Sequence, residues 1–123
     1  MRWEAHKPPR NHSLKGRLSR CREMNISVKG RTSGRIITIP VWFVLEDDRL
    51  YLLPVQGSDT QWYRNVLQHP AIRIAAREEE AEPITDPKQV SAAVEKFRAR
   101  YGAGDVKKYY SKFDVAVLVE RQR

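Results

Sequence analysis

The residues best suited to chemistry lie in one short basic turn, the segment 28–35 with the sequence Val-Lys-Gly-Arg-Thr-Ser-Gly-Arg. Its two glycines allow the backbone to approach a ligand closely, and the hydroxyls of Thr32 and Ser33 can donate hydrogen bonds. The guanidinium groups of Arg31 and Arg35 can each form a pair of hydrogen bonds with a phosphate. The segment therefore predicts either a phosphate-binding turn or an ordinary basic hairpin turn.

A second candidate segment runs from residue 53 to residue 65 and leads from a predicted strand into the start of a helix. Free N–H groups and the positive end of the helix dipole make such a helix start favourable for an anion. The carboxylate of Asp59 would compete with that anion, and its other interpretation is an ordinary helix cap. Trp62 has two interpretations as well, a core residue or one wall of a ligand site.

The sequence offers little support for catalysis by side chains alone. Its three histidines are His6, His12 and His69, which do not have the spacing of metal ligands, and it has no Walker loop. The single cysteine, Cys21, excludes a disulfide framework and a cysteine-based zinc site. We therefore do not expect a hydrolase or a metalloenzyme, and any enzymatic chemistry should come from a bound cofactor.

The positive charge is concentrated at the N-terminus of the chain. The 123 residues are enough for one domain and carry a net charge of +8. Residues 1–35 hold ten of the 23 Lys and Arg side chains but only two of the 15 Asp and Glu, so the excess belongs to this segment. Residues 1–23 have no hydrophobic period, which predicts a disordered basic leader before a folded domain at 24–123. A related hypothesis is that Met24 is the native start.

The elements that must position these residues are short strands and helices. Hydrophobic patterning predicts strands at residues 25–29, 36–45, 49–55, 71–76, 82–84 and 113–120. Helices are predicted at residues 59–68, 87–101 and 105–110, with Ser58 or Asp59, then Asp86, then Asp105 as N-caps. Pro40 interrupts the second strand and predicts a bulge or a free edge there. Together these elements predict a small antiparallel barrel with helices packed outside it.

Several of these segments, taken in order, carry a family resemblance. They are the Gly-Arg-x-Ser-Gly-Arg turn at 30–35 with Pro40 in the next strand, the runs 42–44 and 48–51, the block 57–70, and the closing segment 100–117. In this order the chain resembles the deazaflavin-dependent nitroreductase family, within the flavin-binding split β-barrel superfamily of pyridoxamine phosphate oxidase. The resemblance extends from Asn25 to Glu120.

The resemblance implies a fold, a cofactor and a reaction. The implied fold is α+β and mainly β, a six- to seven-stranded antiparallel split β-barrel with two or three flanking helices. The implied cofactor is the deazaflavin coenzyme F-420 or, as in related proteins, FMN. Its reduced ring would pass hydride to a quinone, a nitroaromatic compound or another electron-poor acceptor. The implied protein is an oxidoreductase that works on small molecules and can form a homodimer.

The resemblance also implies roles for particular residues. Arg31, Thr32, Ser33, Gly34 and Arg35 would bind the cofactor phosphate, Thr38, Pro40 and Trp42 would lie beside the ring, and Val55, Gln56, Gly57 and Trp62 would form the opposite wall. The catalytic candidates are Tyr109 and Tyr110, either of which would reach the acceptor and donate a proton or a hydrogen bond.

Two alternatives to the reductase remain open. Thr32, Ile37 and Gln56 stand where deazaflavin-binding members of the family usually have basic residues. This departure motivates a non-enzymatic split barrel that binds flavin, haem or lipid with a degraded phosphate site. The second alternative is a nucleic-acid binder that uses the basic N-terminal arm. With no membrane span, no signal peptide and one cysteine, the sequence predicts a cytoplasmic protein.

Overall fold

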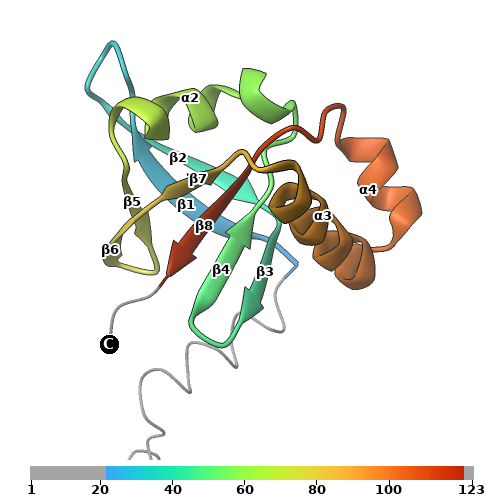
Figure 1. Ribbon diagram of the computed structural model, residues 1–123. Helices are drawn as coiled ribbons and strands as arrows, with labels where there is room; N and C mark the ends of the chain where they lie inside the picture. The colour runs from blue at the N-terminus through green and yellow to red at the C-terminus, as the bar shows by residue number, and fades with distance from the viewer. Residues whose placement is uncertain (1–21, 121–123) are drawn as a thin grey trace, which may run out of the picture.

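Residues 22–120, the part that the structure describes, fold into eight short strands, three α-helices and one 3₁₀ turn (Figure 1). The computed structural model describes residues 22–120, so most of the predicted leader at 1–23 lies outside the described residues and stays a prediction. The strands are β1 Met24–Lys29, β2 Ile36–Val41, β3 Phe43–Glu46, β4 Arg49–Leu52, β5 Ala71–Ile74, β6 Arg77–Glu80, β7 Glu82–Ile84 and β8 Ala116–Glu120. The helices are η1 Gly57–Asp59, α2 Gln61–Gln68, α3 Pro87–Tyr101 and α4 Ala103–Tyr109.

The strands form two antiparallel sheets of four strands each. The first sheet has the order β2-β1-β5-β6, and the second has the order β3-β4-β8-β7. This corrects the prediction of six or seven strands in one barrel, because the described residues contain eight strands and the two sheets do not close into a single barrel. The α+β character and the antiparallel pairing are as predicted.

Two features of the sequence concealed the true strand count. The predicted strand 36–45 is two strands, because β2 pairs with β1 and β3 pairs with β4, while Trp42 between them belongs to neither sheet. The charged run after residue 76 forms β6, in which Glu79 stands opposite Ile72 of β5. Glutamates on both faces hide the alternation by which a strand is recognised. Strands with many charges are typical of sheet edges, which is where β6 lies.

Pro40 lies in β2, at the outer end of the first sheet. Its register partner in β1 is Asn25, and β2 has no other neighbouring strand among residues 22–120. An edge strand tolerates a residue that cannot donate a backbone hydrogen bond. The prediction of a free edge at Pro40 is therefore confirmed.

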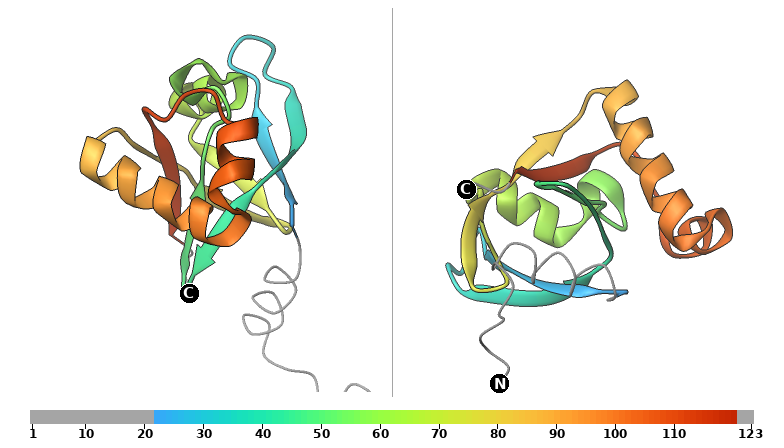
Figure 2. Two further views of the ribbon diagram at one scale, coloured as in Figure 1. Left: turned by 90° about the vertical axis from the view of Figure 1, so that its right-hand side faces the viewer. Right: turned by 90° about the horizontal axis from the view of Figure 1, so that it is seen from below.

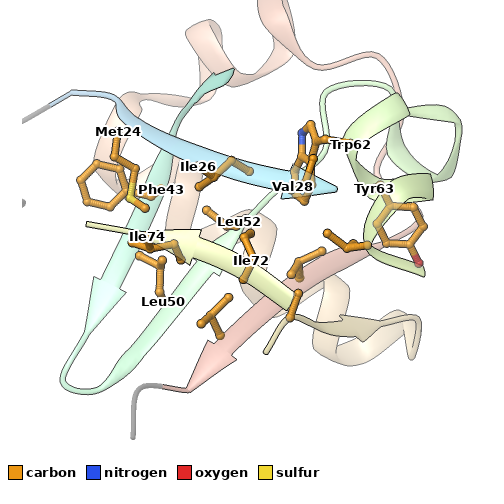
Figure 3. Close-up of a cluster of buried hydrophobic side chains, with 14 of the residues drawn as sticks. Met24, Ile26, Val28, Phe43, Leu50, Leu52, Trp62, Tyr63, Ile72 and Ile74 are labelled. Carbon is orange, nitrogen blue, oxygen red and sulfur yellow. The ribbon is translucent and has the colours of Figure 1, made fainter. Parts of the chain in front are cut away.

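The hydrophobic core lies between the two sheets and is continued by α2. Alternate residues of β1, Met24, Ile26 and Val28, point into it, as the period of two in this strand predicts. Phe43, Leu50, Leu52, Ile72 and Ile74 fill it from the other strands, and Trp62 and Tyr63 of α2 cover one end (Figure 3).

A second cluster fixes α3 and α4 against the outer face of the sheet β3-β4-β8-β7 (Figure 2). Its members on the helices include Val90, Val94, Phe97, Tyr101 and Val106. Burial of both faces explains why β8, with three fully buried side chains, is apolar almost throughout. Within the part of the chain that the structure describes, no helix has the length and apolar character needed to cross a membrane.

The predicted helix caps have mixed outcomes. Asp86 caps α3 as predicted, because its carboxylate accepts a hydrogen bond from the backbone N–H of Gln89 at 3.1 Å. The predicted cap of the preceding helix is wrong, since α2 begins after Thr60 and residues 57–59 form the separate turn η1. The carboxylate of Asp59 instead pairs with Arg64 at 3.4 Å.

The start of α4 also differs from the prediction. Gly102 occupies the N-cap with a φ of 96°, and Asp105 lies in the first turn of the helix. A carboxylate in the first turn is favourable because it faces the positive end of the helix dipole. Asp105 also pairs with the guanidinium of Arg22 at 3.1 Å.

Candidate functional site

A cavity of about 590 Å³ opens where the β2–β3 junction, the segment after β4 and helix α4 come together. Six of the residues predicted from the sequence to bind cofactor or acceptor line it: Pro40, Trp42, Val55, Trp62, Tyr109 and Tyr110. We call it the aromatic cavity, because four of these six residues are aromatic. Its volume lies within the range of roughly 300–1,000 Å³ that is usual for small-ligand sites.

Trp42 is the centre of the aromatic wall. Its ring stacks on Tyr101 with a centroid distance of 4.2 Å and an interplanar angle of 13°. Tyr109 meets the same indole edge-on at 5.6 Å, and Tyr110 lies at 5.9 Å. Trp42 joins β2 to β3 in the chain and belongs to neither sheet. Its side chain is therefore directed by these ring contacts and not by pairing within a sheet.

Tyr101 fixes the end of α3 beside that wall. Its buried hydroxyl accepts a hydrogen bond from the backbone N–H of Phe43 at 3.1 Å. The same oxygen lies 2.9 Å from the carbonyl of Phe43 and 2.9 Å from the carbonyl of Arg22, and it can donate its proton to either. The sequence placed Tyr101 at the end of the predicted helix 87–101 and in the closing segment 100–117, so its polar role was missed.

Tyr109 and Tyr110 differ in environment although they are neighbours in sequence. Tyr109 is 52% exposed, whereas Tyr110 is 5% exposed within the second core cluster. Burial, followed by the nearby Tyr101, raises the pKa of Tyr110 well above its ordinary value. Tyr110 therefore stays protonated at neutral pH and can donate a hydrogen bond, and Tyr109 is the one accessible to solvent.

The basic turn at 30–35 is built as a tight hairpin end. Gly30 donates its N–H to the carbonyl of Arg35 at 2.7 Å, and Gly34 donates to the carbonyl of Gly30 at 3.0 Å. Gly34 has a φ of 72°, a conformation that glycine adopts without strain. The hydroxyl of Ser33 accepts a hydrogen bond from the backbone N–H of Arg35 at 3.1 Å. Thr32, Ser33 and Arg35 are exposed.

Arg31 docks this turn onto α2. Its guanidinium donates from Nη1 to Asn65 Oδ1 at 2.7 Å and from Nη2 to Gln61 Oε1 at 2.7 Å. Its backbone N–H also donates to Asn65 Oδ1, at 3.1 Å. Asn65 is a buried polar side chain, 4% exposed, and these bonds satisfy its oxygen. The sequence did not single out Asn65 for this role.

The loop between β4 and α2 is tied to the segment after α4. Asp114 accepts hydrogen bonds from the backbone N–H of Ser58 at 2.9 Å and from the hydroxyl of Ser58 at 2.6 Å. Burial would raise the pKa of Asp114, but the bonds from Ser58 and the ammonium group of Lys112 hold this pKa below its usual value. Gly57 packs so closely on Asp114 that a Cβ would collide with the carboxylate.

The eight predicted site residues outside the aromatic cavity lie in three places. Five form the turn at the far end of β2, and Thr38 lies along β2, where its hydroxyl is 2.8 Å from that of Ser27. Gln56 donates its N–H to the hydroxyl of Thr60 at 2.8 Å, and Gly57 packs on Asp114. Gln56 and Gly57 thus shape the loop that carries Val55, although they do not line the cavity.

A larger hollow, of about 820 Å³, lies between α2 and the strands β6 and β7. Its lining includes the carboxylates of Glu78, Glu79, Glu80, Glu82 and Glu120. None of the residues predicted to bind a cofactor lines it. Carboxylates at this density would repel a phosphate-bearing coenzyme, so the aromatic cavity is the better candidate site.

The fold places the chain among proteins of the split-barrel type. It is similar to an F420-H2-dependent reductase, FDR-A, with a TM-score of 0.59 and 16% identity over 80% of this chain and 94% of that one. It is also similar to HutZ, the haem storage protein from Vibrio cholerae, with a TM-score of 0.68 and 11% identity over 100% and 92% of the chains. A third similar structure is a domain-swapped dimer, with a TM-score of 0.61 and 13% identity over 91% and 100%.

The family itself is given by the sequence. Residues 16–117 match the profile of the family described as "Uncharacterized protein conserved in bacteria (DUF2255)", and the chain belongs to this family. A comparison with curated proteins gives no match. The structural similarities, all at low identity, establish the fold alone.

Proposed function

We propose that the chain is a hydride-transfer oxidoreductase of the deazaflavin-dependent nitroreductase type. It would hold reduced deazaflavin coenzyme F-420, or FMN, and reduce an electron-poor acceptor of the quinone or nitroaromatic type. The observation that carries this proposal is that residues from three distant segments, Pro40 and Trp42, Val55 and Trp62, and Tyr109 and Tyr110, line one cavity. The fold of the F420-H2-dependent reductase supports it.

The residues of the cavity and of β2 fit a coenzyme with a planar ring and a phosphate arm. Trp42 and the mostly buried Trp62 contribute apolar lining at one end of β2, and the hydroxyl of Ser33 and the guanidinium of Arg35 lie beyond its other end. Six residues of strand separate the two ends by roughly 20 Å. The exposed edge between them includes Thr38, so that an elongated ligand can lie along β2.

The bound coenzyme would supply the hydride, and the chain's own residues would bind and orient the reactants. Ser33 and Arg35 would hold the phosphate, while Arg31 fixes the turn through Gln61 and Asn65. Tyr109, being exposed, would donate a hydrogen bond or a proton to the acceptor. Tyr110, held neutral by its raised pKa, would act only as a hydrogen-bond donor.

The test is a fluorescence titration of reduced F-420 and of FMN with the full-length protein and an Arg35→Gln variant. Loss of a charge-assisted phosphate bond, worth roughly 1.5–3 kcal/mol, should weaken binding about 10- to 100-fold. Arg49→Gln is the matched control, because Arg49 is exposed and pairs with Glu120. The proposal would be removed if neither coenzyme bound at about 100 µM, or if the Arg35→Gln variant bound as tightly as the unchanged protein.

A second candidate is a non-enzymatic split barrel that binds haem, flavin or lipid through the same cavity. It is favoured by Arg31, whose guanidinium is already bonded to Gln61 and Asn65 and so offers less to a phosphate. The fold shared with a haem storage protein also supports it. A haem absorbance shift without any binding of F-420 or FMN would select this candidate over the reductase.

Three further proposals concern the whole protein. We propose a ligand-binding domain at 24–123 in a cytoplasmic protein that can form a homodimer, since a similar fold occurs as a domain-swapped dimer. Light scattering of the full chain tests the dimer. Nucleic-acid binding by the N-terminal arm stays a prediction, and deletion of residues 1–23 should abolish salt-sensitive retention on DNA or RNA if it holds.

A further inference from the structure

The side chain of Arg22 is part of the lining of the aromatic cavity. Its guanidinium carbon lies 5.0 Å from the ring centroid of Trp42 and 5.4 Å from that of Tyr101. The guanidinium also pairs with the carboxylate of Asp105 at 3.1 Å. The cavity lining therefore includes, within the chain itself, a planar organic cation that lies beside the stacked rings of Trp42 and Tyr101 and pairs with a carboxylate.

The remaining lining favours the same kind of ligand. Glu23 is a second carboxylate of the cavity, and among its described lining residues Arg22 is the only cation. The faces of the aromatic rings are negative and attract cations. Outside the lining, the ammonium group of Lys108 lies 5.4 Å from the ring of Tyr109. Aromatic faces with two carboxylates provide poor surroundings for an anion and good ones for a cation.

We propose that the aromatic cavity binds a planar aromatic cation of the pyridinium class, in the place that the guanidinium of Arg22 now holds. The aromatic face of Trp42 and the carboxylate of Asp105 are its principal contacts. This inference goes beyond the proposed function, because it requires no coenzyme and would hold for an enzyme or a binding protein.

The contacts of Arg22 are of a kind that a ligand can displace. Its side chain is 59% exposed and that of Asp105 is 48% exposed, and an exposed ion pair of this sort contributes little to stability. The backbone of Arg22 is fixed separately, because its carbonyl lies 2.9 Å from the hydroxyl of Tyr101. The side chain can leave the ring of Trp42 while the backbone stays where it is.

The experiment uses three ligands that share one ring and differ in charge: 1-methylnicotinamide, a cation; nicotinamide, which is neutral; and nicotinate, an anion. Their affinities for the full-length protein are measured by calorimetry, without coenzyme, and tryptophan quenching reports contact with the cavity. We expect the cation to bind about tenfold more tightly than the neutral compound, and the anion most weakly.

Two variants and one control locate the effect. Arg22→Ala removes the competing guanidinium and should tighten binding of 1-methylnicotinamide by about threefold or more, whereas Asp105→Asn should weaken it by a similar factor. Arg49→Ala is the control, because Arg49 is also 59% exposed and pairs with an exposed carboxylate, that of Glu120, outside the cavity. It should leave the affinity unchanged.

The proposal is overturned if the three compounds bind equally, if none binds, or if nicotinate binds most tightly. It is also overturned if Arg22→Ala fails to tighten binding of the cation relative to Arg49→Ala. Circular dichroism of each variant shows that the fold is retained. The calorimetry uses no coenzyme. Its failure would therefore not affect the titration with F-420 and FMN, and failure of that titration would not affect the calorimetric result.

Discussion

Gly57 and Gly104 are two glycines with opposite requirements. Gly57 has a φ of 55°, and a Cβ at this position would collide with the carboxylate of Asp114. Gly104 lies within α4, and a Cβ there would have no atom within 4 Å. Position 57 therefore requires glycine, because its backbone is left-handed and its surroundings are tight. Gly104 has no such requirement and only weakens its helix.

We expect Gly57→Ala to lower the free energy of unfolding by about 1–3 kcal/mol, because it adds backbone strain and a collision. Gly104→Ala should raise that free energy by about 0.5–1 kcal/mol, since alanine is the better helix former. Urea denaturation of both variants measures the two changes. A stable Gly57→Ala variant would show that the loop does not need a left-handed residue.

Asp114 makes the stability of the same loop depend on pH. Its pKa is lowered in the folded protein from an ordinary value of 3.8, so the ionised form is favoured by folding. Its contribution is therefore complete above that value and is lost as the pH falls through the lowered folded pKa. We expect Asp114→Asn to reduce the melting temperature at pH 7 and to have a smaller effect near pH 3. A difference that is constant across this range would contradict the assignment.

At the scale of single residues, the sequence suggested candidates for the site chemistry but not the residues that hold them in place. The turn arginines and the two tryptophans could be proposed, because their types are characteristic of phosphate and ring binding. Asn65, Tyr101 and Asp114 could not, since each acts through a partner more than 30 positions away. Such long-range hydrogen bonds leave no local pattern in one sequence.

At the scale of elements, the strands rich in apolar residues were predicted, whereas the charged strand β6 was not. β1 alternates strictly and was found, whereas β6 is a run of glutamates and was not. The joint at Trp42 was missed because residues 36–45 are continuously β-forming, and only pairing with different partners divides them. The position of α2 against the turn likewise depends on a tertiary contact, that of Arg31 with Asn65.

That contact gives a prediction for the packing of α2. Asn65→Ala removes the acceptor of the backbone N–H of Arg31 and the acceptor at 2.7 Å of its Nη1 group, and should cost about 1–3 kcal/mol of unfolding free energy. Gln61→Ala removes one exposed bond to the same guanidinium and should cost less than about 1 kcal/mol. Guanidinium chloride denaturation compares the two. Equal losses of unfolding free energy in the two variants would mean that the burial of Asn65 does not contribute to the packing of α2 against the turn.

At the scale of the whole molecule, the family resemblance implied that the site residues lie together, and the fold shows how six of them come to line one cavity. Pro40, Val55 and Tyr109 belong to three segments that meet only because two sheets and α4 surround one cavity. The charge is unevenly distributed along the chain. The whole net charge of +8 lies in residues 1–35, and Arg22, at the start of the described part, lines the cavity.

Truncation at two nearby points separates the basic N-terminal segment from the cavity. Removal of residues 1–21 keeps Arg22 and should leave the affinity for 1-methylnicotinamide unchanged. Removal of residues 1–23 also removes the guanidinium from the ring of Trp42, so that affinity should rise by about threefold, as expected for Arg22→Ala. Because both core clusters consist of residues from 24 onward, both truncated chains should fold. Calorimetry measures the affinity of the two truncated chains for 1-methylnicotinamide. Equal affinities would mean that the guanidinium of Arg22 does not compete for the cavity in solution.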